Sequence, residues 1–172
     1  LSGLLMGLGL FVPFVFLAPY AADRGIAETT AAWLVSLLGL GSLSGRLLLS
    51  AVASRIGLTR LYRYCVLGMG LSFAFWLLAG SSFVMLATFA VLLGLAYGGY
   101  VALSPAVSAQ LFGLVGLAGI LGALYTSSGI GGLAGPPLAG WLIDTTGSYY
   151  AAIGLALALF VGAVIALPPL DT

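Results

Sequence analysis

Residues 37–57 read LLGLGSLSGRLLLSAVASRIG, an apolar, glycine-rich stretch whose first charge is Arg46. The apolar run begins at Ala31, and its length predicts a membrane helix with Arg46 inside it. An arginine side chain stays charged at any ordinary pH, and placing one at the centre of a membrane helix costs about 2.5–3.5 kcal/mol on insertion scales. Such a cost is accepted where the charge meets water, a carboxylate or an anionic ligand. Arg46 is therefore the first candidate for a binding site.

The composition of the whole chain is that of a membrane protein. Of its 172 residues, 62% are hydrophobic and 5% are charged, whereas soluble domains carry about 25% charged residues. There is no histidine, lysine or asparagine, and Cys65 is the single cysteine. These absences argue against an intrachain disulfide, a metal site and a serine protease with a histidine base. We expect no enzyme activity, no cofactor and no nucleic-acid partner, but a multi-pass protein of a plasma or bacterial inner membrane, with the lipid bilayer around it.

Six apolar runs approach or reach the roughly 17–25 residues that cross a bilayer. Pro105 is expected to end the fourth of them, and Pro168 and Pro169 the sixth. Because the chain starts at Leu1 within an apolar run, we expect it to be a piece of a longer protein. The prediction is an all-α membrane protein, a single bundle over residues 1–172 with helices at about residues 2–22, 31–53, 64–79, 83–103, 115–143 and 149–167.

The arginines predict the orientation of this bundle. Arg55, Arg60 and Arg63 all fall in the expected loop 54–63, and an excess of arginine marks a cytoplasmic loop. An even number of crossings then places both chain ends in the cytoplasm, including the tail with Asp171.

Glycines and prolines recur in patterns that affect helix packing. Small residues four positions apart let two helix backbones approach closely, and the pairs are Gly41 with Gly45, and Gly131 with Gly135. Prolines inside a helix remove a backbone hydrogen bond, as expected at Pro13, Pro136 and Pro137. Two interpretations remain open: a tightly packed bundle, or the broken helices of a transporter site.

Ser42 and Ser50 lie one turn before and after Arg46, so the three side chains share a helix face. In one interpretation Arg46 reaches towards the lipid headgroups. In the other it binds an anion, because a guanidinium matches a carboxylate with two parallel hydrogen bonds. No acidic residue is expected at the same depth, so the countercharge would come from a substrate, water or another segment.

Two tyrosines in the segment GLAYGGY, Tyr97 and Tyr100, are further candidates. Their hydroxyl groups suit the wall of a cavity. Packing of the rings against glycine surfaces is an equally good interpretation.

Four segments together resemble the C-terminal six-helix half of a major facilitator superfamily transporter, and within it the monocarboxylate transporter group. The resemblance covers essentially the whole chain. The segments are GLFVPFVFLAPYAADRGI (residues 9–26), GSLSGRLLLSAVASRIG (41–57), GLAYGG (94–99) and GPPLAGWLIDTTGSYYAA (135–152).

The resemblance implies a missing N-terminal six-helix half and alternating access between the two halves. It assigns the substrate carboxylate to Arg46, substrate selectivity to Tyr97 and part of the pocket lining to Phe11. Ser42 stands where proton-coupled members carry an acid. The absence of a second basic residue in the fifth helix favours a substrate with one carboxylate.

We therefore expect secondary transport, by proton-coupled symport, of small organic anions, in particular monocarboxylates. The alternative is a non-transporting receptor or structural membrane module with the same fold, which would show no saturable uptake.

Overall fold

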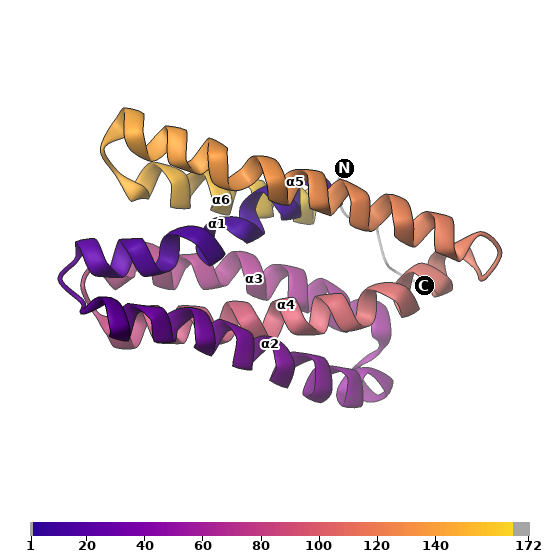
Figure 1. Ribbon diagram of the computed structural model, residues 1–172. Helices are drawn as coiled ribbons and strands as arrows, with labels where there is room; N and C mark the ends of the chain where they lie inside the picture. The colour runs from indigo at the N-terminus through magenta and orange to yellow at the C-terminus, as the bar shows by residue number, and fades with distance from the viewer. Residues whose placement is uncertain (1, 167–172) are drawn as a thin grey trace.

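The computed structural model describes residues 2–166, and these form a bundle of six helices without a strand (Figure 1). Five of the helices are long and apolar enough to cross a membrane, and α6, with 17 residues, is shorter. The expectation of an all-α membrane bundle is confirmed. The helices are α1 (Ser2–Asp23), α2 (Glu28–Ile56), α3 (Leu58–Ala79), α4 (Phe83–Phe112), α5 (Leu117–Thr146) and α6 (Tyr149–Ile165). The expected prolines at the end of α6 and Asp171 lie outside the described residues.

The expected loop 54–63 is almost entirely helical. Only Gly57, with a φ of 95°, separates α2 from α3. The polar composition of this segment suggested a loop, but arginine is a good helix former, so its charges extend two helices instead of separating them. Arg55 lies in the last turn of α2, and Arg60 and Arg63 lie in the first turns of α3.

Pro105 does not end α4, which continues for seven residues to Phe112. A proline removes the hydrogen bond that its own N–H would donate, but membrane helices tolerate this where side chains satisfy the backbone. The carbonyl that Pro105 leaves without its usual donor is that of Val101, four residues earlier, and the neighbouring buried Ser104 hydroxyl donates to the carbonyl oxygen of Tyr100, 2.6 Å away. Residues 106–112 prolong α4 beyond the end that was expected at about residue 103.

The closest helix contact in the bundle joins α2 to α4. A Cβ atom added at Gly41 would lie 2.8 Å from the Val91 carbonyl oxygen, and one at Gly45 would collide with the backbone of α4. Gly94 and Gly98 of α4 in turn face the backbone of α2. The two glycine pairs thus form one seam in which the backbones touch, and the pair on α4 was not singled out from the sequence.

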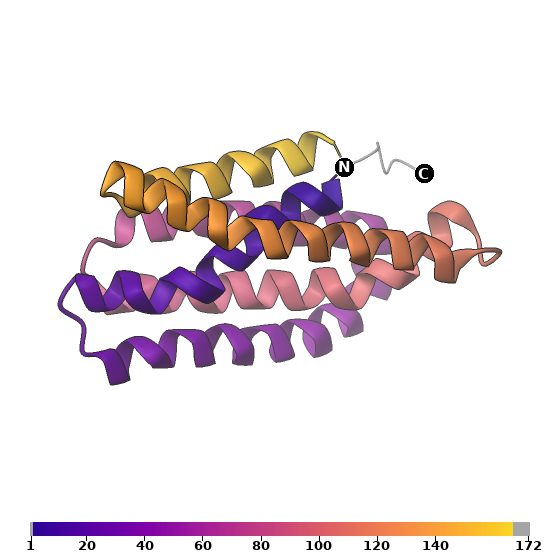
Figure 2. The ribbon, with the colours of Figure 1, turned by 45° about the horizontal axis from the view of Figure 1, so that its top comes forward.

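A second seam joins α5 to α1, two helices far apart in the sequence (Figure 2). Gly131 and Gly135 lie against the backbone of α1. One turn earlier, the Ser128 hydroxyl donates to the Gly3 carbonyl oxygen at 3.1 Å. α1 bends in its middle (Figure 2), where Pro13 lies, whereas α5 runs through Pro136 and Pro137 as one helix.

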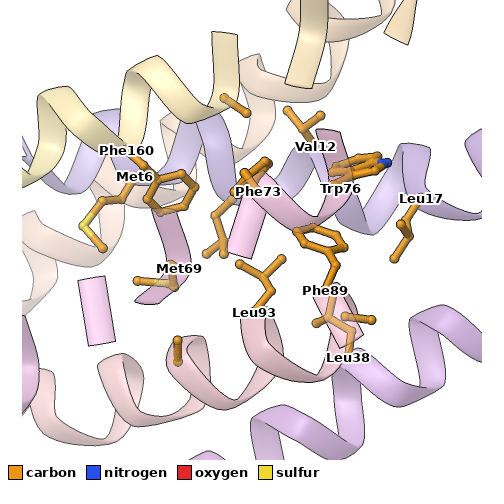
Figure 3. Packing of buried hydrophobic residues seen from close by; sticks show 14 of the residues in the cluster. Met6, Val12, Leu17, Leu38, Met69, Phe73, Trp76, Phe89, Leu93 and Phe160 are labelled. Carbon is orange, nitrogen blue, oxygen red and sulfur yellow. The ribbon is translucent and has the colours of Figure 1, made fainter. Parts of the chain in front are cut away.

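An aromatic cluster at the centre of the bundle holds the two seams together (Figure 3). The Phe73 ring of α3 lies 5.5 Å from Phe89 of α4 and 5.3 Å from Phe160 of α6, centroid to centroid. Trp76 stacks on Phe89 at 4.9 Å and meets Tyr20 of α1 edge to face at 5.8 Å. These fully buried rings come from four helices, so α3 is the element around which α1, α4 and α6 pack.

The two ends of the bundle carry opposite charges. The α1–α2, α3–α4 and α5–α6 connections gather at one end, with the acidic residues Asp23, Glu28 and Asp144 in or near them (Figure 1). At this end the Tyr149 hydroxyl donates to Asp23 Oδ2 at 2.7 Å, which ties α6 to α1. The α2–α3 and α4–α5 connections lie at the opposite end, with the three clustered arginines.

Candidate functional site

Arg46 lines an open hollow of about 370 Å³ between α1, α2 and α4. Ser42 lies one turn of α2 before Arg46. It is only 8% exposed and forms part of the floor of this hollow. We call this space the Arg46 hollow. Its lining residues are Phe14, Leu38, Gly39, Ser42, Leu43, Arg46 and Tyr97.

Arg46 is exposed and has no ion-pair partner among residues 2–166. The acidic residues of the described chain lie at one end of the bundle, in or beside its connections. Arg46, in contrast, lies 18 residues into the 29-residue helix α2. The site therefore presents an uncompensated guanidinium, whose planar set of donors fits a carboxylate.

Two aromatic rings form an apolar wall of the hollow. Phe14 of α1 and Tyr97 of α4 meet edge to face, with ring centroids 6.1 Å apart and planes at 76°. Edge-to-face pairs of this kind are favoured by the charge distribution of the rings. A ligand held by Arg46 would therefore meet a charged group on one side and aromatic surface on another.

Three of the five predicted binding residues, Arg46, Ser42 and Tyr97, come together at the hollow. The other two do not line it. The Phe11 ring lies next to that of Phe14, with centroids 5.7 Å apart, and packs against Gly132 of α5. Tyr100 follows Tyr97 by three residues on α4, and its side chain points into the bundle. It is 5% exposed, and its ring centroid lies 5.2 Å from that of Tyr62 of α3.

Phe14 was not assigned to the site from the sequence. It follows Phe11 at a spacing of three residues, which places both rings on neighbouring positions of one helix face. That spacing could have identified it. The hollow is also lined by Leu38, Gly39 and Leu43, which were not predicted. Leucine and glycine do not by themselves indicate a binding site.

One face of α2, beside the hollow, and one face of α5 are left uncovered by residues 2–166. α5 buries only Gly131, Gly135 and Ala139, all on the side of α1. Large apolar side chains such as Leu47 and Leu133 are exposed on α2 and α5. Among the described residues no group of three histidine, cysteine or acidic side chains could hold a metal ion.

The chain matches the family model described as Major Facilitator Superfamily over residues 1–171. It is 38% identical to Monocarboxylate transporter 12-B of Danio rerio, over 95% of this chain and 37% of that protein. It is 35% identical to Monocarboxylate transporter 11 of Homo sapiens, with 88% and 34% covered. An MFS-type transporter of Gibberella moniliformis is 31% identical, with 87% and 36% covered. The chain thus spans about a third of the length of these relatives.

Proposed function

Because the chain belongs to the major facilitator superfamily, we propose that it forms the C-terminal six-helix half of a secondary transporter for small organic monocarboxylates. The observation that carries this proposal is the uncompensated Arg46 in a hollow between α1, α2 and α4. The names of the monocarboxylate transporters among its relatives agree with it. The resemblance recognised in the sequence is confirmed by the family match, and so is the location in a membrane.

In the proposed mechanism Arg46 holds the substrate carboxylate with two hydrogen bonds. The organic part of the substrate rests against Phe14 and Tyr97. The exposed faces of α2 and α5 pack against the N-terminal half, and rocking of the two halves opens the hollow to each side of the membrane in turn. The cytoplasm lies on the side of Arg55, Arg60 and Arg63.

We further propose that transport is coupled to protons, with the proton carrier in the N-terminal half. Ser42 occupies the position one turn before Arg46, and a serine hydroxyl does not release a proton near neutral pH. Within the described residues no carboxyl group lies beside the hollow to take that role. In this proposal Arg46 accounts for substrate binding, and the group that carries the proton lies in the N-terminal half.

The test is saturable uptake of short monocarboxylates by the full-length protein, with Arg46→Lys as the variant. Lysine keeps the charge but not the paired donors. Loss of one hydrogen bond to a charged group, about 1.5–3 kcal/mol, should raise KM about tenfold or more. Arg55→Lys, at the end of α2, is the matched control and should transport normally.

Two results would contradict the proposal. Unchanged transport in Arg46→Lys would remove Arg46 from the binding site. Absence of any saturable uptake by the unmodified protein, when it is folded in the membrane, would favour the receptor or structural alternative.

A further inference from the structure

A second depression in the bundle shares no residue with the Arg46 hollow. It is an open groove of about 300 Å³ bounded by α2, α3 and α4, three helices that lie side by side in both views (Figures 1 and 2). We call it the lateral groove. Its lining residues are Leu49, Leu61, Tyr64, Cys65, Gly68, Leu71, Ser72, Phe75, Leu92, Leu95 and Ala96.

The lateral groove offers almost no polar group to a ligand. The Ser72 hydroxyl is buried and already donates to the Met69 carbonyl oxygen at 2.6 Å. Cys65 is buried and behaves as a small apolar residue. Tyr64, 58% exposed, is the polar residue at the edge of the groove. A polar ligand would lose its hydrogen bonds here, whereas a hydrocarbon chain would not.

The shape of the groove is that of a strip along one helix. Its α3 lining runs from Leu61 to Phe75, which is about 21 Å at the 1.5 Å rise per residue of an α-helix. That is most of the roughly 30 Å thickness of the hydrocarbon core of a bilayer. Gly68 lies half-buried in the middle of this strip and leaves room for a chain to lie against the backbone.

The charge at one end of the strip is positive. Arg60 is exposed and lies one turn before Tyr64, so it continues the face formed by Tyr64 and Gly68. Arg55 and Arg63 lie at the same end of the bundle, and no acidic residue among residues 2–166 does. The first turn of α3 adds the partial positive charge of a helix N-terminus. A negatively charged headgroup is thus favoured at the end of an apolar strip.

We propose that an anionic glycerophospholipid binds at this place, with one acyl chain in the lateral groove and its phosphate at Arg60. The ligand combines the two features of the site, a hydrocarbon chain that runs along α3 and a negative charge at its start. Basic residues at the cytoplasmic end of membrane helices are known to attract such headgroups. The proposal depends on the membrane location of the chain and not on the identity of a transported substrate.

The headgroup is tested by titrating the full-length protein in detergent with phosphatidylglycerol or phosphatidylcholine and counting bound lipids by native mass spectrometry. The unmodified protein should prefer phosphatidylglycerol. Arg60→Gln should lower that preference about fivefold, the effect of one arginine near a membrane surface. Arg55→Gln removes the same charge at the same end, six residues beyond Leu49 on a different face of α2, and should retain the preference. Equal losses in both variants, or none in either, would overturn the proposal.

The acyl chain is tested with a phosphatidylglycerol that carries a photoreactive group in its chain. Cross-links should map to the segments 61–75 and 92–96. Gly68→Leu should suppress them, because an added Cβ fits at 3.4 Å from Ala96 and the longer side chain fills the groove. A circular dichroism spectrum equal to that of the unmodified protein verifies the fold of this variant. Labelling centred on α6, or unchanged by Gly68→Leu in the folded protein, would contradict the proposed position.

Discussion

The seam between α2 and α4 leads to a prediction about two glycines that are two residues apart in the sequence. An added Cβ at Gly41 would lie 2.8 Å from the Val91 carbonyl oxygen, whereas ordinary contacts begin at 3.4 Å. Gly39 has no atom within 4 Å of the same position. Gly41→Ala therefore requires the two backbones to separate, by 0.6 Å if the contact is to become an ordinary one, whereas Gly39→Ala requires no movement.

The expected magnitude follows from two opposing effects. Alanine favours an α-helix over glycine by about 1 kcal/mol in water, and this gain is common to both variants. Overpacking of a tight contact typically costs about 1–3 kcal/mol, and this cost applies only to Gly41→Ala. The difference between the two variants should therefore be about 1–3 kcal/mol, with Gly41→Ala the less stable.

The assay is reversible unfolding of the full-length protein in mixed detergent micelles, followed by circular dichroism. The comparison between Gly41→Ala and Gly39→Ala cancels the propensity term and leaves the packing term. Unfolding of both variants at the same detergent fraction would refute the reasoning. It would mean that α2 and α4 accommodate a methyl group at Gly41 without loss of stability.

Two other predictions concern the hollow and the end of the bundle. Phe14→Ala should raise KM for monocarboxylates more than Phe11→Ala does, because Phe14 lines the Arg46 hollow and Phe11 does not; equal effects in an uptake assay would contradict this arrangement. Tyr149→Phe removes the hydroxyl that donates to Asp23. A double-mutant cycle with Asp23→Ala in the unfolding assay should give a coupling of about 1 kcal/mol, and a coupling of zero would show that the bond does not form.

Much of the fold could be predicted because hydrocarbon imposes a simple rule on the backbone. Only helices and closed barrels satisfy all backbone groups within a bilayer, so long apolar runs identify the helices. The ends of the helices were predicted less well, since the rule no longer applies at the membrane surface. There Arg55 and Arg60 extend helices that their charge was expected to end, and α4 continues through Pro105 to Phe112.

The candidate site was predicted as far as single residues could reveal it. Arg46 could be identified from its charge alone, and Tyr97 and Ser42 come with it to the hollow. The choice of Phe11 over Phe14, and the inclusion of Tyr100, depended on which way each side chain points. That direction is set by the bend of α1 and the close packing of α4, which are tertiary properties that periodicity in one helix does not contain.

The contact between α1 and α5 has a consequence for how the protein is made. The hydrogen bond from Ser128 to Gly3 joins residues 125 positions apart. At a synthesis rate of about 5–20 residues per second, α1 waits roughly 6–25 s in the membrane before α5 is available. During that time the glycine-lined surface of α1 lacks the helix that covers it in the folded bundle. α1 is thus made well before the helix that covers it, and membrane chaperones have that interval in which to act on it.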